Sequence, residues 1–201
     1  MYPATQSFRT KTVNSYFIAL LFLMAVALMV PRAAKAANLV QNPGFETGNL
    51  TNWYITGDPA NMHVGSDDPH SGTYAFDGSP TGAEGYVNQD FSGLGNNQYD
   101  LQFYIDQRNT NGNYFEVQWD GKTIYQLLNS GQTGYQLVQL NGLQASGGTD
   151  TLTFGFIGSG QTSWSLDDVD LEQAGTPEPG TLMLLGTGVV SLSGVMRRRL
   201  S

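Results

Sequence analysis

Residues 99–106 read Tyr99-Asp100-Leu101-Gln102-Phe103-Tyr104-Ile105-Asp106, and their pattern determines the fold class. Apolar residues alternate with polar ones, and a period of two indicates a strand with one buried face. The run at 114–119 alternates in the same way, and Asp120-Gly121 then leads into 122–127, which predicts a tight hairpin. The chain is therefore built from half-buried strands.

Shorter runs of the same kind fill the rest of the region from about residue 38 to residue 171. Turns rich in Gly, Asn, Asp and Ser separate them, and no stretch shows a convincing helical period. The further predicted strands are 53–56, 62–64, 72–76, 85–91, 136–143, 151–156 and 163–171. About ten strands predict an all-β domain, a jelly-roll β-sandwich. Trp53 and Trp119 fall on inward strand positions or in the opening stretch of the domain, and we expect both in the core.

The closing strand breaks its own alternation. Trp164 and Leu166 have one parity, whereas Val169 and Leu171 have the other. A β-bulge at Asp167-Asp168 would return both pairs to the core. It would also turn one carboxylate inward, where a lone charge is costly unless it is paired or bound to a metal.

The charge of the central region is strongly one-sided. Residues 37–196 hold two basic side chains, Arg108 and Lys122, against all 17 acidic ones, a net charge of −15. Such a surface repels phosphate backbones, so nucleic acid is excluded as a partner. It suits divalent cations or neutral ligands, or it is simply a solvated acidic surface. The 201 residues include no cysteine, which removes disulfides and thiol chemistry.

The N-terminal 36 residues have the pattern of a secretory signal peptide. Arg9 and Lys11 precede an apolar run from Tyr16 to Val30, and Ala34-Lys35-Ala36 offers a cleavage site between small residues. An uncleaved N-terminal anchor is the alternative. Either interpretation places the central region outside the cytoplasm.

The C-terminal 25 residues join Pro177-Glu178-Pro179 to an apolar run, Gly180 to Met196, and to Arg197-Arg198-Arg199. The 17 uncharged residues are near the lower limit for a membrane helix, and the arginines would hold its end in the cytoplasm. The three parts in this order resemble the PEP-CTERM sorting signal. This resemblance implies transient anchoring in the inner membrane with the body in the periplasm, processing by an exosortase-type protease, and delivery to the cell surface or the extracellular matrix. A permanent C-terminal anchor is the alternative.

The chain thus divides into four predicted parts. They are a signal peptide at 1–36, a β-sandwich domain at 37–172, a linker with the Pro-Glu-Pro box at 173–179, and a transmembrane helix with an arginine-rich tail at 180–201.

Three short stretches bracket the central domain: Asn42-Pro43-Gly44-Phe45-Glu46, His70-Ser71-Gly72 and Leu166-Asp167-Asp168-Val169. They are similar to galactose-binding-like jelly rolls, including carbohydrate-binding modules. The resemblance implies one structural calcium ion, held by Glu46 and by Asp167 or Asp168, with carbonyls near Gly44 and Ser71. Hard oxygen ligands suit calcium. The alternative is that these acids cap turns or bond backbone amides.

Outward positions of the central strands combine tyrosines with amides and carboxylates. Rings of this kind stack on the C–H faces of sugars while the polar groups bond their hydroxyls. We therefore expect one carbohydrate-binding face, to which Arg108 could add donors. Its candidate residues are Gln102, Tyr104, Tyr114, Glu116, Gln118 and Tyr86, with Asp106, Asn88 and Asp90 as neighbours. The alternative is the ordinary solvent face of a sandwich.

Other chemistry has little support. His63 and His70, near Asp67 and Asp68, could bind a transition metal, but three or four ligands are needed and turn roles are favoured. No Gly-x-Ser-x-Gly elbow or partnered histidine appears. A carboxylate pair could cleave glycosides, but none of the acids stands out. We therefore predict that the protein is not an enzyme.

The sequence thus predicts an exported β-sandwich that is sorted by an exosortase. Its resemblance to PEP-CTERM proteins implies an association with exopolysaccharide and biofilm. Carbohydrate binding is one version of this function, and a purely structural or adhesive matrix protein is another. A glycoside-active enzyme is a distant third.

Overall fold

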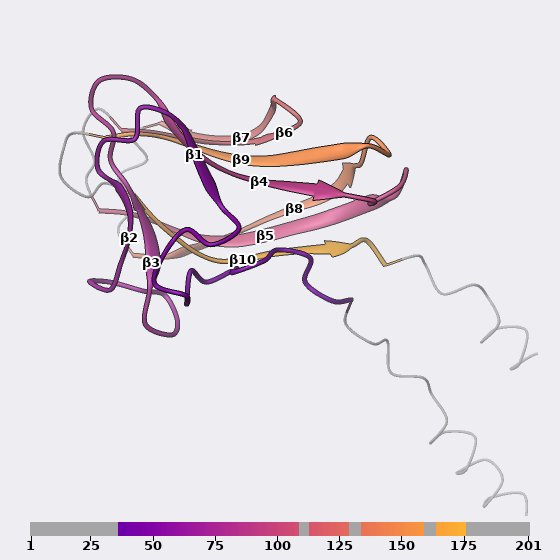
Figure 1. Ribbon diagram of the computed structural model, residues 1–201, viewed down its shortest axis with the longest axis horizontal. Coiled ribbons are helices and arrows are strands. Elements are labelled where there is room, and N and C mark those ends of the chain that lie inside the picture. Colours follow the sequence, from indigo (N-terminus) through magenta and orange to yellow (C-terminus); the bar gives the residue numbers. More distant parts are fainter. Residues whose placement is uncertain (1–35, 109–112, 129–133, 159–163, 176–201) are drawn as a thin grey trace, which may run out of the picture. The chain divides into compact units, whose positions relative to one another are not determined.

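The computed structural model describes residues 36–108, 113–128, 134–158 and 164–175, and its strands lie in two layers (Figure 1). The strands are β1 (Tyr54–Gly57), β2 (Met62–Gly65), β3 (Ala75–Gly78), β4 (Gly85–Ser92), β5 (Gln98–Gln107), β6 (Tyr114–Trp119), β7 (Lys122–Leu128), β8 (Gln136–Gln144), β9 (Thr149–Ile157) and β10 (Trp164–Gln173). These ranges contain strands and no helix, which confirms the predicted all-β class.

Each layer is an antiparallel sheet of five strands. The A sheet has the order β1-β4-β9-β6-β7, and the B sheet has the order β2-β3-β10-β5-β8. The sheets face each other as in a jelly-roll sandwich, with the A sheet uppermost in Figure 1. The predicted hairpin is β6–β7, whose turn residues Asp120 and Gly121 have φ values of 51° and 72°. β5 and β6, however, follow one another in sequence and belong to opposite sheets.

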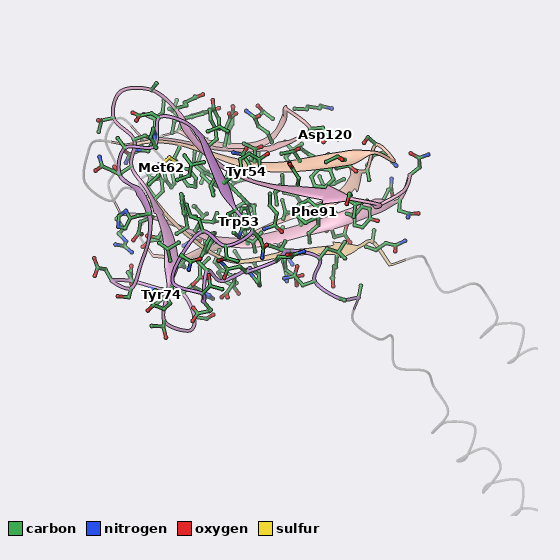
Figure 2. All side chains as sticks on the ribbon, viewed as in Figure 1. Trp53, Tyr54, Met62, Tyr74, Phe91 and Asp120 are labelled. Carbon is green, nitrogen blue, oxygen red and sulfur yellow. The ribbon has the colours of Figure 1, made fainter. Side chains whose placement is uncertain are left out.

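Aromatic side chains fill the space between the sheets. Phe115 of the A sheet packs on Phe154 and Phe156 in its own sheet and on Trp164 of the B sheet, with ring centroids 5.3 to 6.2 Å apart. All four rings are fully buried. Trp53, labelled in Figure 2, is buried as well, as is Trp119, so both predictions are confirmed.

The predicted bulge in β10 is present. The pairing of β10 with β5 shifts between Asp167 and Asp170, and Asp168 takes a left-handed φ of 49°. As a result Trp164, Leu166, Val169 and Leu171 are all fully buried. The carboxylate that the bulge buries is that of Asp167, which lies beneath the backbone of residues 70–71 rather than between the sheets.

The N-terminal segment of the domain is fastened to its last strand. The amide of Leu39 donates to the carbonyl of Leu171 at 2.8 Å, and the side chain of Asn38 bonds the backbone of Val169 and Leu171. In the described ranges the buried hydrophobic residues run from Val40 to Leu171 and the last strand ends at Gln173.

No helix in the described ranges is long and apolar enough to cross a membrane. The predicted signal peptide, the Pro-Glu-Pro box and the apolar run 180–196 lie outside these ranges.

Candidate functional site

The outward-facing residues of the A sheet form a grid that we call the A face. Strand register places Tyr86 beside Gly155 and Gly155 beside Glu116, while Asn88, Thr153 and Gln118 form the next row. Tyr114 and Asp90 continue these strands with the same parity. The A face comprises Tyr54, Thr56, Tyr86, Asn88, Asp90, Tyr114, Glu116, Gln118, Thr123, Gln126, Leu128, Thr151, Thr153, Gly155 and Ile157, together with Glu84, which precedes β4 and accepts from Tyr86. The predicted residues Tyr86, Tyr114, Glu116 and Gln118 therefore do share one face.

The prediction that Gln102 and Tyr104 belong to this face is wrong. Both lie on β5, which is in the B sheet. Their side chains therefore point outward on the other side of the sandwich from the A face. The ring of His70 also covers Tyr104, with centroids 3.5 Å apart. Arg108, expected as a donor to a ligand, is instead paired with carboxylates next to the B sheet.

Each of the three tyrosines on the A face donates its hydroxyl to a carboxylate. Tyr114 bonds Glu116 at 2.9 Å, Tyr54 bonds Asp90 at 2.9 Å, and Tyr86 bonds Glu84. Burial and the neighbouring carboxylates raise the pKa of Tyr114 to about 12 and also raise the pKa values of Tyr54 and Tyr86. The hydroxyls therefore stay protonated, and each ring is held by its bond to an acid.

Two glycines allow the ring of Tyr86 to lie low over the sheet. A Cβ atom at Gly155 would be 2.8 Å from Cε1 of this ring and 2.9 Å from Cγ of Glu116. A Cβ atom at Gly57 would be 3.1 Å from its Cδ2. No other residue fits beneath the ring without moving it, so Gly155 and Gly57 form its support.

Polar side chains lock the rest of the grid. Glu116 is only 5% exposed although it points outward, because Thr123 and Gln118 also donate to its carboxylate. Asn88 accepts from Thr153 at 2.8 Å and donates across to β1. Such a network fixes the orientation of the face before any ligand arrives.

An open groove of about 410 Å³ continues the A face at its β1 edge, where Tyr54 lies (Figure 2). Its volume lies within the ~300–1,000 Å³ typical of ligand sites. Tyr54 and Asp90 belong to both the face and the groove. The groove is lined by Leu39, Gln41, Asn52, Tyr54, Gln89, Asp90, Phe91, Ser92 and Leu94.

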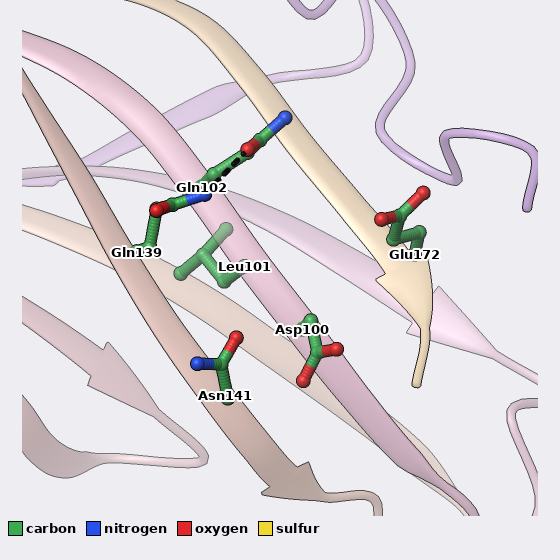
Figure 3. A pocket seen from close by; sticks show the side chains of 6 residues that line it. All are labelled: Asp100, Leu101, Gln102, Gln139, Asn141 and Glu172. Atoms are coloured by element: carbon green, nitrogen blue, oxygen red, sulfur yellow. Dashed lines mark hydrogen bonds between the residues drawn. The ribbon is translucent and has the colours of Figure 1, made fainter. Parts of the chain in front are cut away.

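A second hollow lies on the B sheet between β8, β5 and β10, and Figure 3 shows its lining. Gln139 donates to Gln102 across the strands at 3.2 Å, and Asp100 faces Glu172 in register. Its volume of about 80 Å³ leaves little space beyond a few water molecules. This hollow is too small to hold a sugar ring.

The residues predicted to hold calcium do come together around Gly44. A Cβ atom there would lie 3.3 Å from Oδ1 of Asp167 and 3.4 Å from Oδ1 of Asp168. It would also lie 3.6 Å from Cγ of Glu46. Ser71 donates its hydroxyl to Asp168 at 2.8 Å. The chemistry of this donor set, one carboxylate from the start of the domain and two from β10, suits calcium.

Backbone amides already bond these carboxylates, as the alternative prediction requires. Oδ2 of Asp167 accepts from the amides of His70 and Ser71 at 2.9 and 3.1 Å. Glu46 accepts from the amides of Thr73 and Tyr74. Among the residues that the structure describes, no group of three or more acidic or histidine side chains is arranged to hold a metal ion. Calcium would have to compete with these amides, and its binding stays a prediction.

The two histidines occupy structural positions. Nδ1 of His70 is 2.7 Å from Asp168, and its ring lies between Tyr104 and Tyr135. His63 sits on β2 beside Asp77 of β3. The predicted turn role fits His70, which lies in a loop, but is wrong for His63, which lies on strand β2.

Sequence reasoning missed Tyr54, Glu84 and Gly155. Parity could have found the first two, because Tyr54 follows an inward Trp53 and Glu84 has the parity of Tyr86. Nothing in the sequence marks Gly155 as the floor beneath a ring, because that contact joins β9 to β4 across some 70 residues.

Comparison with solved structures agrees with this fold. TmCBM61, solved in complex with β-1,4-galactotriose, has a TM-score of 0.57 at 21% identity over 69% of this chain and 100% of that one. The family 22 module of Clostridium thermocellum Xyn10B has a TM-score of 0.51 at 15% identity, covering 73% and 99%. The K3 adhesin domain of Lys-gingipain from Porphyromonas gingivalis has 0.51 at 16%, covering 68% and 99%. At these identities the likeness concerns the fold alone.

Family models identify two parts of the chain. No curated protein sequence matches it. The PEP-CTERM protein-sorting motif matches residues 176–199, which indicates an exported protein sorted by way of the membrane. A carbohydrate binding domain matches residues 37–154, more than half of the chain. The protein therefore belongs to this family of carbohydrate-binding domains and carries a PEP-CTERM sorting motif at its C-terminal end.

Proposed function

We propose that this is a non-enzymatic carbohydrate-binding protein whose ligand lies across the A face. One observation carries the proposal: Tyr54, Tyr86 and Tyr114 lie on the same face, each held by a carboxylate. Rings held in this way stack on the C–H faces of sugars at little cost in side-chain entropy. The match to a carbohydrate-binding family supports the proposal.

The groove beside Tyr54 extends the surface available to a polysaccharide. A chain lying over Tyr86 and Tyr114 would reach the groove at the edge of the A sheet, where Asp90 and the amide of Asn52 offer polar partners. Stacking and hydrogen bonding of this kind bind a glycan without cleaving it.

The sorting motif supports a proposal about where the protein meets its ligand. We propose that the domain passes through the periplasm and is released to the cell surface or extracellular matrix, where it contacts exopolysaccharide and takes part in biofilm. Exosortase-type processing is the step that the motif implies.

A structural or adhesive role has one observation in its favour. β8 forms an edge of the B sheet over nine residues, and none of them is charged. An uncharged edge strand can pair with strands of another molecule. Self-association of the domain without retention by any polysaccharide would favour this role.

The test is affinity electrophoresis of residues 36–175 in gels that contain single polysaccharides. We expect retardation by at least one glycan, and a roughly tenfold weaker affinity when Tyr86→Ala or Tyr114→Ala removes a stacking ring. Tyr104→Ala is the matched control, because this tyrosine lies on the other sheet. No retardation by any polysaccharide would refute the proposal, and release of reducing sugar would show an enzyme instead.

We also propose that Glu46, Asp167 and Asp168 hold a structural calcium ion. The support is their convergence around Gly44, with Arg108 paired to other acids and His70 in contact with Asp168 alone of the three among the described residues. Calcium should then raise the melting temperature and a chelator should lower it, because the ion would join residues from both ends of the domain. An unchanged melting temperature would leave amide capping as the only role of these acids.

A further inference from the structure

The side-chain hydrogen-bond donors of the A face are bonded to acceptors of the protein itself. The hydroxyls of Tyr54, Tyr86 and Tyr114 go to Asp90, Glu84 and Glu116, as described above. The donors of six further contacts are likewise directed at protein acceptors: Asn88 to Thr56 and Tyr54, Thr153 to Asn88, Thr151 to Asp90, and Thr123 and Gln118 to Glu116. What this face offers a ligand is mainly lone pairs on carboxylate and phenolic oxygens.

Two rings and two carboxylates gather at one place on this face. Cε1 of Tyr86 and Cγ of Glu116 lie 2.8 and 2.9 Å from the position of a Cβ atom at Gly155, and the hydroxyls of Tyr86 and Tyr114 donate to Glu84 and Glu116. The register explains this proximity, because Tyr86 and Glu116 flank the same glycine of β9, Gly155. Aromatic rings beside carboxylates are the surroundings that bind an ammonium group, through the ring faces and through charge-assisted hydrogen bonds.

The domain supplies almost no positive charge of its own here. Between residues 37 and 175 the only basic residues are Arg108 and Lys122. Arg108 is engaged by Asp68, Asp77 and Asp106. Lys122 stands at the β6–β7 turn, at the end of the sheet remote from Tyr114. The carboxylates of the A face therefore lack a cationic partner among the described residues.

We propose that the A face is specific for saccharides that carry free amino groups, with the ammonium seated between Glu84, Glu116 and the rings of Tyr86 and Tyr114. This inference rests on the proposed carbohydrate binding and names its ligand class. The sugar ring stacks on Tyr86 over its glycine support, and the ammonium supplies the donors and the positive charge that the face lacks. Uronate and sulfated polymers bring acceptors and negative charge, so the same face repels them.

The experiment compares oligomers of β-1,4-linked glucosamine with N-acetylglucosamine oligomers of equal length, measured by calorimetry on residues 36–175. We expect the free-amine oligomer to bind at least roughly tenfold more tightly, since hydrogen bonds to charged groups are worth more than neutral ones. Its affinity should fall as salt rises. Polygalacturonate should not bind.

Variants test which carboxylates hold the ammonium group. Glu84→Gln, at the rim, and Glu116→Gln should each bring the ratio of the free-amine affinity to the acetylated-oligomer affinity from roughly tenfold towards one, and this ratio is the readout because both acids also hold the stacking rings. Glu172→Gln, an acid of the B sheet, is the control and should leave the preference intact. Circular dichroism and the melting temperature report whether each variant is folded, and Glu84→Gln carries the test if Glu116→Gln unfolds.

The outcomes separate the two proposals. Binding of neutral glycans through Tyr86 without any preference for the amine overturns the amino-sugar inference and leaves carbohydrate binding standing. An amine preference that survives both glutamine variants also overturns it, because the ammonium would then lie elsewhere. Failure to bind any glycan overturns both.

Discussion

At the scale of single residues, Arg108 pairs with three acids, of which Asp68 is exposed and the other two are barely reached by water. Its guanidinium lies 3.3 Å from Asp68, 3.6 Å from Asp77 and 3.9 Å from Asp106. Asp77 and Asp106 are only 3% and 4% exposed, and burial raises the pKa of both. Two buried carboxylates thus depend on one partly exposed cation.

Replacing this cation should be costly. We expect Arg108→Met to lower the free energy of unfolding by about 3 kcal/mol, because it leaves the carboxylates of Asp77 and Asp106 buried without a counter-charge. Urea denaturation at neutral pH measures it. Lys122→Met is the control: this residue is exposed at the first position of β7 and should change stability by less than about 0.5 kcal/mol. Equal effects of the two substitutions would contradict this account.

Asp167 should make stability depend on pH in an unusual direction. Burial raises its pKa to about 6, so the folded chain holds this proton after the unfolded chain has lost it. Its contribution is therefore present below about pH 4 and is lost as pH rises to about 6, by at most about 3 kcal/mol. Denaturation with chelator between these pH values should show a more negative slope for the wild type than for Asp167→Asn. The opposite order would refute the raised pKa.

At the scale of elements, β10 depends on a single extra residue. Asp168 sits in the bulge, and its left-handed φ of 49° lets Val169 and Leu171 return to the core that Trp164 and Leu166 already occupy. The sequence predicted this bulge because apolar parity changes across Asp167-Asp168. The prediction was possible because the signal is local.

Deleting Asp168 should therefore leave the core intact. The strand would continue without the bulge, and Val169 and Leu171 would take the parity of Trp164 and Leu166 and still face inward, so the loss is confined to the contacts of the Asp168 side chain with His70 and Ser71. Deletion of Asp170 is the contrast, because it turns Leu171, a fully buried side chain, outward and should cost about 2–3 kcal/mol. Thermal unfolding followed by circular dichroism measures both. An Asp168 deletion that destabilises the domain as much as the Asp170 deletion would contradict this account of the bulge.

Pairing between elements was harder to predict than the elements themselves. Alternation located the strands, including the β6–β7 hairpin with its Asp-Gly turn. Alternation says which residues share one face of a strand but not which sheet that strand joins. β5 and β6 have near-identical patterns, yet the chain crosses from one sheet to the other between them. This crossing separated Gln102 and Tyr104 from Tyr114 and Glu116.

At the scale of the whole molecule, the sequence motifs at the ends predicted more than the pattern of the middle did. The PEP-CTERM motif at residues 176–199 is recognised from its three parts in order, without any knowledge of the fold. The binding face, in contrast, depends on rows that cross four or five strands, such as Thr56, Tyr86, Gly155 and Glu116. Only the folded sheet brings such residues together.

Processing of the C-terminal end should be visible by mass. We expect the mature protein to lack the residues beyond about Pro179, because the apolar run is short, contains several glycines and follows a Pro-Glu-Pro box. Intact-mass spectrometry of surface-exposed protein measures it, with protein from a strain lacking the exosortase-type protease as the control. Surface protein that retains Arg197–Arg199 would contradict removal.

The central position of β10 in the B sheet also has a mechanical consequence. This last strand is paired with β3 on one side and β5 on the other. Asn38 and Leu39 also bond its backbone near the C-terminal end, at Val169 and Leu171. A tether attached beyond Gln173 would pull along this strand, so force would shear many parallel hydrogen bonds at once instead of peeling them singly. The domain should therefore withstand drag on a polysaccharide held at its opposite sheet, and its lifetime under tension is set by the rate of forced unfolding.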